Sequence, residues 1–420
     1  MAAGCQTVPQ PGNYASLGRV RRPRHTASPS YGMPSSRGIM DLPKNMIGNR
    51  RFLFAGLVFM LCIAGLSGAP QIPGVADTLP ERLEDQEFWR IATEFSEPDG
   101  YFRSDNLLSN EMSMQYVIPD LLLRTRPGGA YLGVGPEQNF TYIAAVKPKI
   151  AFITDIRRGN THTQLMYKAL FELSADRADF VSRLFTRKRP DGLGASATAQ
   201  DLLGAISAVS AGDETACKGN LKAINDLLVQ KHKFPLSDED LAGIEYVYHS
   251  FYAFGPGINY GSTGQGFGGR GGRSSTYADL MTQTDGNGVN RGYLANEENY
   301  KILKDLEEKN LIVPLVGNFA GPKAIRAVGK YLKEHGATVT AFYLSNVEQY
   351  LGGTWNTFCT NVASLPLDEK STFIRASRGG GLGYGSGGGL TTSLGSMLAE
   401  TKSCGGIQLV PPASGEARKR

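Results

Sequence analysis

The 420-residue sequence predicts an α/β fold with a mainly parallel sheet and helices on both faces. Short apolar runs typical of doubly buried strands alternate with amphipathic segments between residues 128 and 377. Glycine and polar residues follow several of these runs directly, as expected where a strand turns into a helix. Hydrophobic residues make up 41% of the chain and charged residues 20%, so there is ample material for a buried core.

Residues 1–45 are expected to form a disordered basic segment. They are rich in Pro, Ser, Gly and Arg and show no apolar periodicity, so they cannot build a core. Residues 1–51 hold eight basic side chains and one acidic residue, Asp41. Their net charge of +7 exceeds the net charge of +5 for the whole chain. The remainder is slightly acidic, and nucleic acid is therefore not an expected partner.

Residues 46–69 are expected to be a signal peptide or a transmembrane anchor. The stretch 52–69 carries no charge and follows the pair Arg50 and Arg51 directly. Its length lies between a long signal-peptide core and a short membrane span, and both alternatives stay open. In either case the positive flank stays in the cytoplasm, so we expect a cell-envelope protein that meets the membrane through residues 52–69 and places its α/β domain outside. Met46 is an alternative start.

The first half of the α/β domain, 80–377, is expected to begin with helices near 87–92 and 117–123. A strand then ends at Gly133, a tight turn contains Gly135, and a helix starts at Pro136, whose missing N–H suits the first helical position. The segments that follow are a strand at 149–155 and a long helix at 162–185.

Residues 187–310 are expected to be an insertion, helical at 199–250 and a glycine-rich surface loop from 255 to about 300. The α/β pattern then resumes. Its expected elements are strand 311–316, helix 322–334, strand 337–344, a helix around 355–362 and strand 371–376. Residues 378–420 begin with a glycine run and are expected to be a disordered tail.

The cysteines and histidines exclude several classes of site. Cys217, Cys359 and Cys404 show no metal-ligand spacing, so no metal is expected. One disulfide bond among them is compatible with the sequence. The five histidines are scattered, and the sequence has no G-x-S-x-G elbow, no P-loop and no H-E-x-x-H motif. Hydrolase, P-loop and zinc-protease functions are therefore disfavoured.

Asp155 favours a nucleoside-type ligand. It stands at the end of the second predicted strand, 22 residues after Gly133, where a carboxylate can accept hydrogen bonds from both ribose hydroxyls. A dinucleotide site would want a small residue where Gln138 stands, and Glu137 in the first helical turn would oppose a phosphate. S-adenosylmethionine has no phosphate and carries a positive sulfonium, so these residues favour it over NAD.

The segment Leu132-Gly133-Val134-Gly135 together with Asp155 resembles the first two motifs of the class I S-adenosylmethionine-dependent methyltransferases. The span 80–377 as a whole resembles an uncharacterised bacterial family of exported proteins that share this Rossmann-like, methyltransferase-like fold. The resemblance implies S-adenosylmethionine as cofactor and assigns no catalytic residue. The residues expected to bind the cofactor are Gly133, Gly135, Glu137 and Asp155, and those expected to bind the substrate are Asn318, Asn346 and Tyr260.

Two functional hypotheses remain open. The first is a methyltransferase that binds S-adenosylmethionine at the strand ends. The second is a non-catalytic envelope protein that uses the same fold to bind a small molecule or a protein partner. The glycine turn and Asp155 favour the first. Export, Tyr131 in place of the usual acid and Glu137 in place of a third glycine favour the second, because S-adenosylmethionine is made and kept in the cytoplasm.

Overall fold

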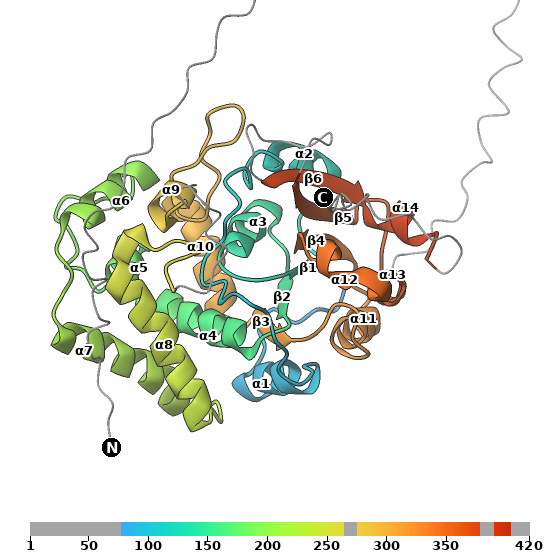
Figure 1. The fold of residues 1–420 in the computed structure, drawn as a ribbon, viewed down its shortest axis with the longest axis horizontal. Coiled ribbons are helices and arrows are strands. Elements are labelled where there is room, and N and C mark those ends of the chain that lie inside the picture. Colours follow the sequence, from blue (N-terminus) through green and yellow to red (C-terminus); the bar gives the residue numbers. More distant parts are fainter. Residues whose placement is uncertain (1–76, 264–274, 379–389, 405–420) are drawn as a thin grey trace, which may run out of the picture. The chain divides into compact units, whose positions relative to one another are not determined.

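The computed structural model describes residues 77–263, 275–378 and 390–404 (Figure 1). The expectations for 1–45 and 46–69 therefore concern residues outside the described part of the chain. Among the helices in the described ranges, none is long and apolar enough to cross a membrane.

A six-stranded sheet forms the centre of the domain, in the order β3-β2-β1-β4-β5-β6. The first five strands run parallel, and β6 pairs antiparallel with β5 at the edge. This confirms the predicted α/β fold with a mainly parallel sheet. The strands are β1 Ala130–Gly133, β2 Ile150–Asp155, β3 Ile312–Val316, β4 Val339–Ser345, β5 Thr372–Arg378 and β6 Leu390–Ser396.

Helices cover both faces of the sheet (Figure 1). The chain moves from β1 through β2 to β3 in one direction and then returns to β4 and β5 on the other side of β1. Because such crossovers are right-handed, the two halves place their helices on opposite faces. On one face lie α3 Gln138–Val146, α4 Arg158–Leu173 and α10 Glu297–Glu308, and on the other lie α11 Ala324–Glu334 and α13 Trp355–Ala363.

The first helices agree with the sequence-based expectation, whereas the long helix predicted at 162–185 is wrong. Helix α1 spans Asp85–Glu94 and α2 spans Ile118–Arg124. The predicted long helix is two helices: α4 ends at Leu173, and α5 spans Arg177–Leu184. Asp176 separates them because its side chain accepts the Asp179 N–H and caps α5.

The helical part of the insertion packs on α4. Two of its helices begin with capping boxes, Thr198 with Asp201 and Ser237 with Asp240, in which side chain and backbone satisfy each other. Its elements are α6 Ala199–Ala208, α7 Glu214–Asn225, a π-helical segment Asp226–Lys231 and α8 Asp238–Phe254.

The loop expected from 255 to about 300 is only partly a loop. A 3-10 turn spans Gly255–Gly257, α9 spans Tyr277–Met281 and α10 already begins at Glu297. Buried tyrosine rings fix this segment against α4 and α5. Tyr293 and Tyr300 are fully buried, and the ring of Tyr300 stacks on Phe171 at 5.4 Å. The glycine content indicated turns correctly but gave no sign of these aromatic anchors. Residues 264–274 lie outside the described ranges.

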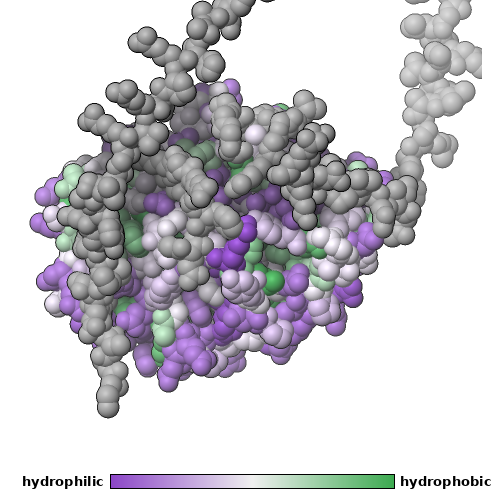
Figure 2. All heavy atoms as spheres, in the orientation of Figure 1, coloured by the Kyte–Doolittle hydropathy of each residue, from purple (hydrophilic) through white to green (hydrophobic). Residues whose placement is uncertain are grey.

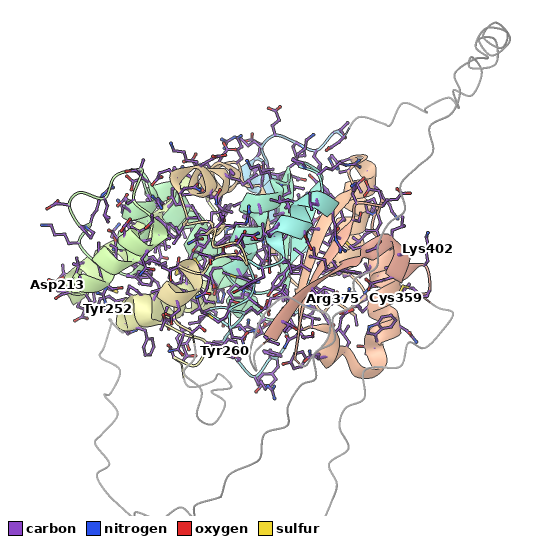
Figure 3. The ribbon with its side chains drawn as sticks, turned by 90° about the horizontal axis from the view of Figure 1, so that it is seen from above. Asp213, Tyr252, Tyr260, Cys359, Arg375 and Lys402 are labelled. Atoms are coloured by element: carbon purple, nitrogen blue, oxygen red, sulfur yellow. A yellow bond between two sulfur atoms is a disulfide. The ribbon has the colours of Figure 1, made fainter. Side chains whose placement is uncertain are left out.

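The tail expected to be disordered over 378–420 is ordered in part. Residues 390–396 form β6, and α14 follows at Met397–Thr401. A disulfide bond between Cys359 in α13 and Cys404 attaches this segment, with 5.5 Å between the two Cα atoms (Figure 3). Arg375 in β5 also holds it, because its guanidinium pairs with Glu400 at 2.8 Å. Pairing across a sheet edge supplied the order that local composition did not predict.

Candidate functional site

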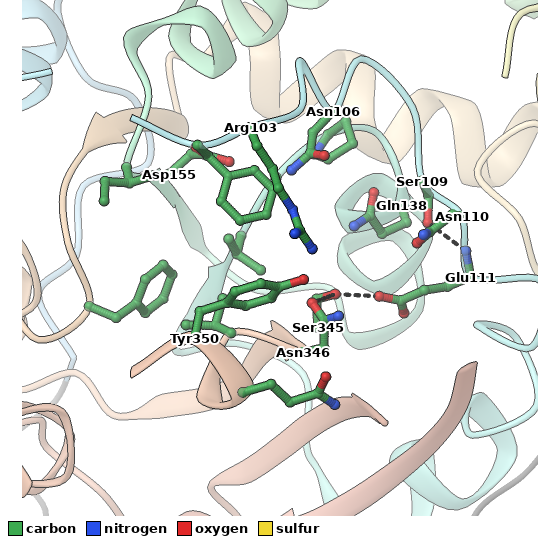
Figure 4. Close-up of a pocket in the computed structure, with 18 of the residues that line it drawn as sticks. Arg103, Asn106, Ser109, Asn110, Glu111, Gln138, Asp155, Ser345, Asn346 and Tyr350 are labelled. Atoms are coloured by element: carbon green, nitrogen blue, oxygen red, sulfur yellow. Dashed lines mark hydrogen bonds between the residues drawn. The ribbon is translucent and has the colours of Figure 1, made fainter. Parts of the chain in front are cut away.

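A cavity of about 500 Å³ lies where β1, β2, β3 and β4 end (Figure 4). The strand order reverses between β1 and β4, and open α/β sheets bind ligands at the carboxyl ends of strands beside such a reversal. Its volume falls within the range of small-molecule sites, about 300–1,000 Å³. The lining segments come from 102–111, 134–138, 155–156, 318–319 and 345–354, together with Tyr260.

Five of the seven residues predicted to form the site line this cavity. They come from separate strand ends and from the segment after α8, so the fold brings them together although they are distant in sequence. These five are Gly135, Asp155, Tyr260, Asn318 and Asn346. Gly133 and Glu137, the other two, are not among its lining residues and are buried beside it.

Gly133 serves packing within the turn. A Cβ atom at this position would lie 1.9 Å from Oδ1 of Asn139, so only glycine fits here. Gly135 differs, because it lines the cavity and its φ of +78° lies in the left-handed region that favours glycine. Of the two glycines in the predicted motif, Gly135 is thus the one that faces ligand space.

Glu137 is a fully buried carboxyl group. Its Oε1 accepts the Ser109 N–H at 3.2 Å, while its Oε2 has no hydrogen-bond partner among the described residues. Burial raises the pKa of Glu137 to about 8, so the side chain is mainly neutral at pH 7. Glu137 would therefore repel a phosphate less strongly than an ionised carboxylate would.

Asp155 forms an ion pair with Arg157 in the following turn. Its Oδ1 accepts the Arg157 backbone N–H at 2.9 Å, and its Oδ2 accepts from Nη2 at 3.1 Å. A third bond runs from Nε to Oδ1 at 3.2 Å. A carboxylate offers about four acceptor positions, so one on Oδ2 remains for a ligand hydroxyl. The ion pair holds the carboxylate at the cavity wall.

The two predicted asparagines stand on turns after their strands. Asn318 closes an Asx turn, in which its Oδ1 accepts the Ala320 N–H at 2.9 Å, and its own N–H donates to Glu97. Asn346 follows β4, and Tyr260 lies half-buried beyond α8. The amide of Asn318 therefore has a structural role in addition to its place in the cavity wall.

Sequence reasoning missed the segment 102–111, before α2, that forms one wall of the cavity. It contributes Arg103, Asn106 and Glu111, and Figure 4 shows the side chains of Arg103 and Tyr350 extending into the same space. No motif marks this stretch of the sequence. The run from Ser104 to Glu111, polar yet interrupted by two leucines, was the only signal.

A chain of hydrogen bonds crosses the cavity floor. Gln138 Nε2 donates to the hydroxyl of Tyr343 at 2.9 Å, and that hydroxyl donates to Glu111 Oε1 at 2.6 Å. Ser345 Oγ also donates to Glu111 Oε1 (Figure 4). Burial raises the pKa of Glu111, and the two hydroxyl donors oppose that rise. A carboxyl group is thus held in a fixed position within the site.

Two lining residues have strained backbones. Asn106 has φ +46° and Ser345 has φ +51°, in the left-handed region that residues other than glycine seldom adopt. Such conformations cost about 1–3 kcal/mol and concentrate at functional sites. At Ser345 this conformation accompanies the hydrogen bond from its hydroxyl to Glu111.

The rest of the described chain offers neither a metal site nor a large apolar patch on the face in view. In the described ranges, no group of three or more His, Cys, Asp or Glu residues is placed to hold a metal ion. Figure 2 shows a face on which the described residues are mostly hydrophilic, with hydrophobic residues visible only in small separate areas.

Comparisons with known proteins give a family but no function. No curated protein matches the chain. A family model described as "Domain of unknown function (DUF7790)" matches residues 107–195 and 273–397. The matched segments contain all six strands and most of the cavity wall, whereas 196–272, which holds α6, α7 and α8, is left out. The chain therefore belongs to this family, the domain of unknown function DUF7790.

Proposed function

We propose that this protein binds a nucleoside-type small molecule, S-adenosylmethionine, in the strand-end cavity and acts as a methyltransferase. The observation that carries the proposal is the position of the cavity at the strand-order reversal, with Gly135 and Asp155 in its wall. This is where the proposed nucleoside would need a close backbone approach and a hydroxyl acceptor.

The residues present fit such a cofactor. The remaining acceptor position on Asp155 suits a ribose hydroxyl, and Gly135 leaves room beside the turn. The carboxyl group of Glu111 is compatible with a cationic ligand. Bound S-adenosylmethionine would supply an electrophilic methyl group. Tyr260 and Asn346 would orient the acceptor beside it.

We also propose that the domain works outside the cytoplasm, in the cell envelope. The proposal rests on the uncharged stretch 52–69 and on the disulfide bond between Cys359 and Cys404. Disulfide bonds persist in oxidising compartments and are rare in the cytoplasm. Residues 46–69 would either stay attached and anchor the protein in the membrane or be cleaved as a signal peptide.

The same disulfide bond favours a second candidate function. Because S-adenosylmethionine is kept in the cytoplasm, an external domain would meet little of it. The alternative is a non-catalytic envelope protein that binds another small molecule, or a protein partner, at the same cavity. Under this alternative the fold is retained and S-adenosylmethionine does not bind.

Calorimetric titration of the purified full-length protein with S-adenosylmethionine and S-adenosylhomocysteine tests the proposal. Saturable binding is expected, and Asp155→Asn should weaken it at least about tenfold, since one charged hydrogen bond is lost. Asp285→Asn is the matched control. Asp285 is likewise buried and pairs with an arginine, Arg291, at 2.6 Å, but it does not line the cavity.

Binding that survives Asp155→Asn unchanged, or that both variants weaken equally, would overturn the assignment of Asp155. A folded wild-type protein that binds neither compound would leave the non-catalytic function as the one to pursue.

A further inference from the structure

The mouth of the cavity is built almost entirely from neutral side chains. We define the mouth as the described lining residues that are exposed to solvent, which are Arg103, Asn110, Asn318, Gln349, Tyr350 and Thr354. Three of these six residues carry side-chain amides, and none of the six is acidic. Arg103 carries the single charge of the mouth and already takes part in an interaction. A ligand at the mouth therefore meets amides and an aromatic ring.

The amide groups of the mouth have hydrogen-bonding atoms to spare. Within the described ranges, the side chains of Asn110 and Gln349 form no hydrogen bond, and both residues are exposed, so a ligand can reach them. Asn318 uses its Oδ1 to accept the Ala320 N–H, which leaves its Nδ2 to donate. Each amide offers two N–H donors and one oxygen acceptor. Hydroxyl groups also donate and accept, so a polyhydroxylated ligand matches this set.

Tyr350 adds an aromatic surface to the mouth. Its side chain is 51% exposed and extends into the cavity (Figure 4). The ring makes an edge-to-face contact with Phe102, with 5.3 Å between the ring centroids, and this contact limits its movement. Tyrosine combines a flat apolar ring with a polar tip, which suits ligands that have both kinds of surface. A sugar ring is such a ligand, because its C–H groups form an apolar face and its hydroxyl groups surround it.

The carboxyl groups of the cavity wall do not reach the mouth. Asp155 and Glu111 are 4% and 1% exposed, and Asp155 is paired with Arg157 at 3.1 Å. The proposed nucleoside would use Asp155 at the strand ends. The exposed amides and Tyr350 are left for a second, uncharged group.

We infer that the mouth of the cavity binds a neutral sugar residue, with its hydroxyl groups on the amides and its C–H face on Tyr350. The inference deepens the proposed function, because it names the class of molecule that would lie beside the nucleoside. It rests on the proposed function only in placing a ligand in the same cavity. Sugar binding requires neither S-adenosylmethionine nor methyl transfer.

Saturation-transfer NMR on the full-length protein tests the inference with three uncharged probes. Cellobiose and maltose are disaccharides with different linkages, and sorbitol is a polyol that has hydroxyl groups but no ring. At least one of the two disaccharides should give a saturable signal. Sorbitol at the same concentration should give none, because it has no rigid apolar face to place on Tyr350.

Substitutions of Tyr350 test the stacking contact. Tyr350→Ala should weaken disaccharide binding about three- to tenfold, the effect expected for one lost aromatic contact. Tyr350→Phe keeps the ring and should restore most of the affinity. Tyr101→Ala is the matched control, because Tyr101 is 84% exposed and does not line the cavity. That variant should bind like the wild type.

Gln349→Ala tests the amide contacts independently of the ring. It removes one hydrogen-bonding group and should weaken disaccharide binding about threefold or more. Gln230→Ala is the matched control, because Gln230 is also exposed but lies outside the cavity. Thermal melts check that all four alanine and phenylalanine variants at positions 349, 350, 101 and 230 remain folded.

The outcomes separate this inference from the proposed function. Binding of neither disaccharide, equal binding of sorbitol, or disaccharide binding that Tyr350→Ala and Gln349→Ala leave unchanged would overturn the sugar site. Disaccharide binding without binding of S-adenosylmethionine would support the sugar site and count against the nucleoside proposal. Binding of S-adenosylmethionine that Tyr350→Ala weakens, with no disaccharide binding, would assign the ring to the nucleoside and overturn the inference alone.

Discussion

Asn139 occupies the space beside Gly133 that any side chain at that position would need. Its Oδ1 lies 1.9 Å from the place of a Cβ atom and accepts the hydroxyl proton of Tyr131 at 2.9 Å. Its Nδ2 donates to the carbonyl oxygens of Val134 and Pro136 at 2.9 and 2.8 Å. One buried amide therefore organises the whole turn from β1 to α3, and this turn forms part of the cavity wall.

Gly133→Ala should destabilise the protein. The added methyl group would displace the Asn139 amide and its hydrogen bonds, and overpacking of this kind costs about 1–3 kcal/mol. Gly204→Ala in α6 is the control. It meets open space and should raise stability by about 0.5–1 kcal/mol through helix propensity. Urea unfolding curves measure both, and equal effects of the two variants would contradict the packing role of Gly133.

The sequence predicted the parts of this fold that depend on local patterns. The predicted strands 149–155 and 311–316 each contain a continuous apolar run because both of their faces are buried, and they appear as β2 and β3. Strand β6 was missed because Leu390–Ser396 is rich in Thr and Ser, follows a glycine run and becomes ordered only through pairing with β5. Such long-range pairing leaves no periodic signal in the strand itself.

The candidate site likewise contains residues that the sequence could predict and residues that it could not. Asp155 and Asn346 could be predicted because parallel strands end at one edge of a sheet. Glu111 could not, because its contact with Ser345 joins residues 234 positions apart and no motif marks either one. Glu137 was assigned to the cofactor on its position in the turn, yet helical geometry directs its side chain into the core, where Ser109 binds it.

Reduction of the Cys359–Cys404 bond should lower the melting temperature. The bond closes a 45-residue separation and attaches α14 to α13, and bonds of this kind contribute about 2–4 kcal/mol. Cys404→Ser should reproduce the effect and make the protein insensitive to reductant. Differential alkylation with mass spectrometry checks that the bond is present before the melts. An unchanged melting temperature after verified reduction would contradict a stabilising role.

Glu172→Gln should destabilise the protein strongly. This buried carboxylate accepts from Lys168 at 2.9 Å, Lys231 at 2.8 Å and His232 at 2.9 Å. Its loss would leave Lys168 buried without its charge partner, which costs about 3–5 kcal/mol. Lys231→Ala is the control, because that side chain is 63% exposed and should cost less than about 1 kcal/mol. Chemical denaturation measures the difference, and similar losses in both variants would refute the argument.

Glu137→Gln should flatten the pH dependence of stability between pH 5 and 8. Burial raises the pKa of Glu137 in the folded state to about 8, above its usual value of 4.5, so the folded protein holds this proton more tightly than the unfolded chain. The resulting stability is fully present below pH 4.5 and is lost as the pH rises to 8, by up to about 1.4 kcal/mol per pH unit. The amide that replaces the carboxyl group does not titrate and can still accept the Ser109 N–H. The difference in free energy of unfolding between wild type and variant should therefore shift by roughly 3–4 kcal/mol from pH 5 to pH 8, in favour of the variant.

Asp285→Asn supplies the control for this pH series. Hydrogen bonds from Arg291 and from backbone N–H groups lower the pKa of Asp285 below its usual value of 3.8, so its contribution is lost only at a pH below that value. The difference between wild type and Asp285→Asn should stay constant from pH 5 to pH 8, whereas the Glu137→Gln difference changes over the same range. Urea unfolding at pH 5, 6, 7 and 8 measures both series. Parallel curves of unfolding free energy against pH for wild type and Glu137→Gln would mean that Glu137 is ionised in the folded protein. The assignment of a neutral carboxyl group beside the cavity would then be wrong.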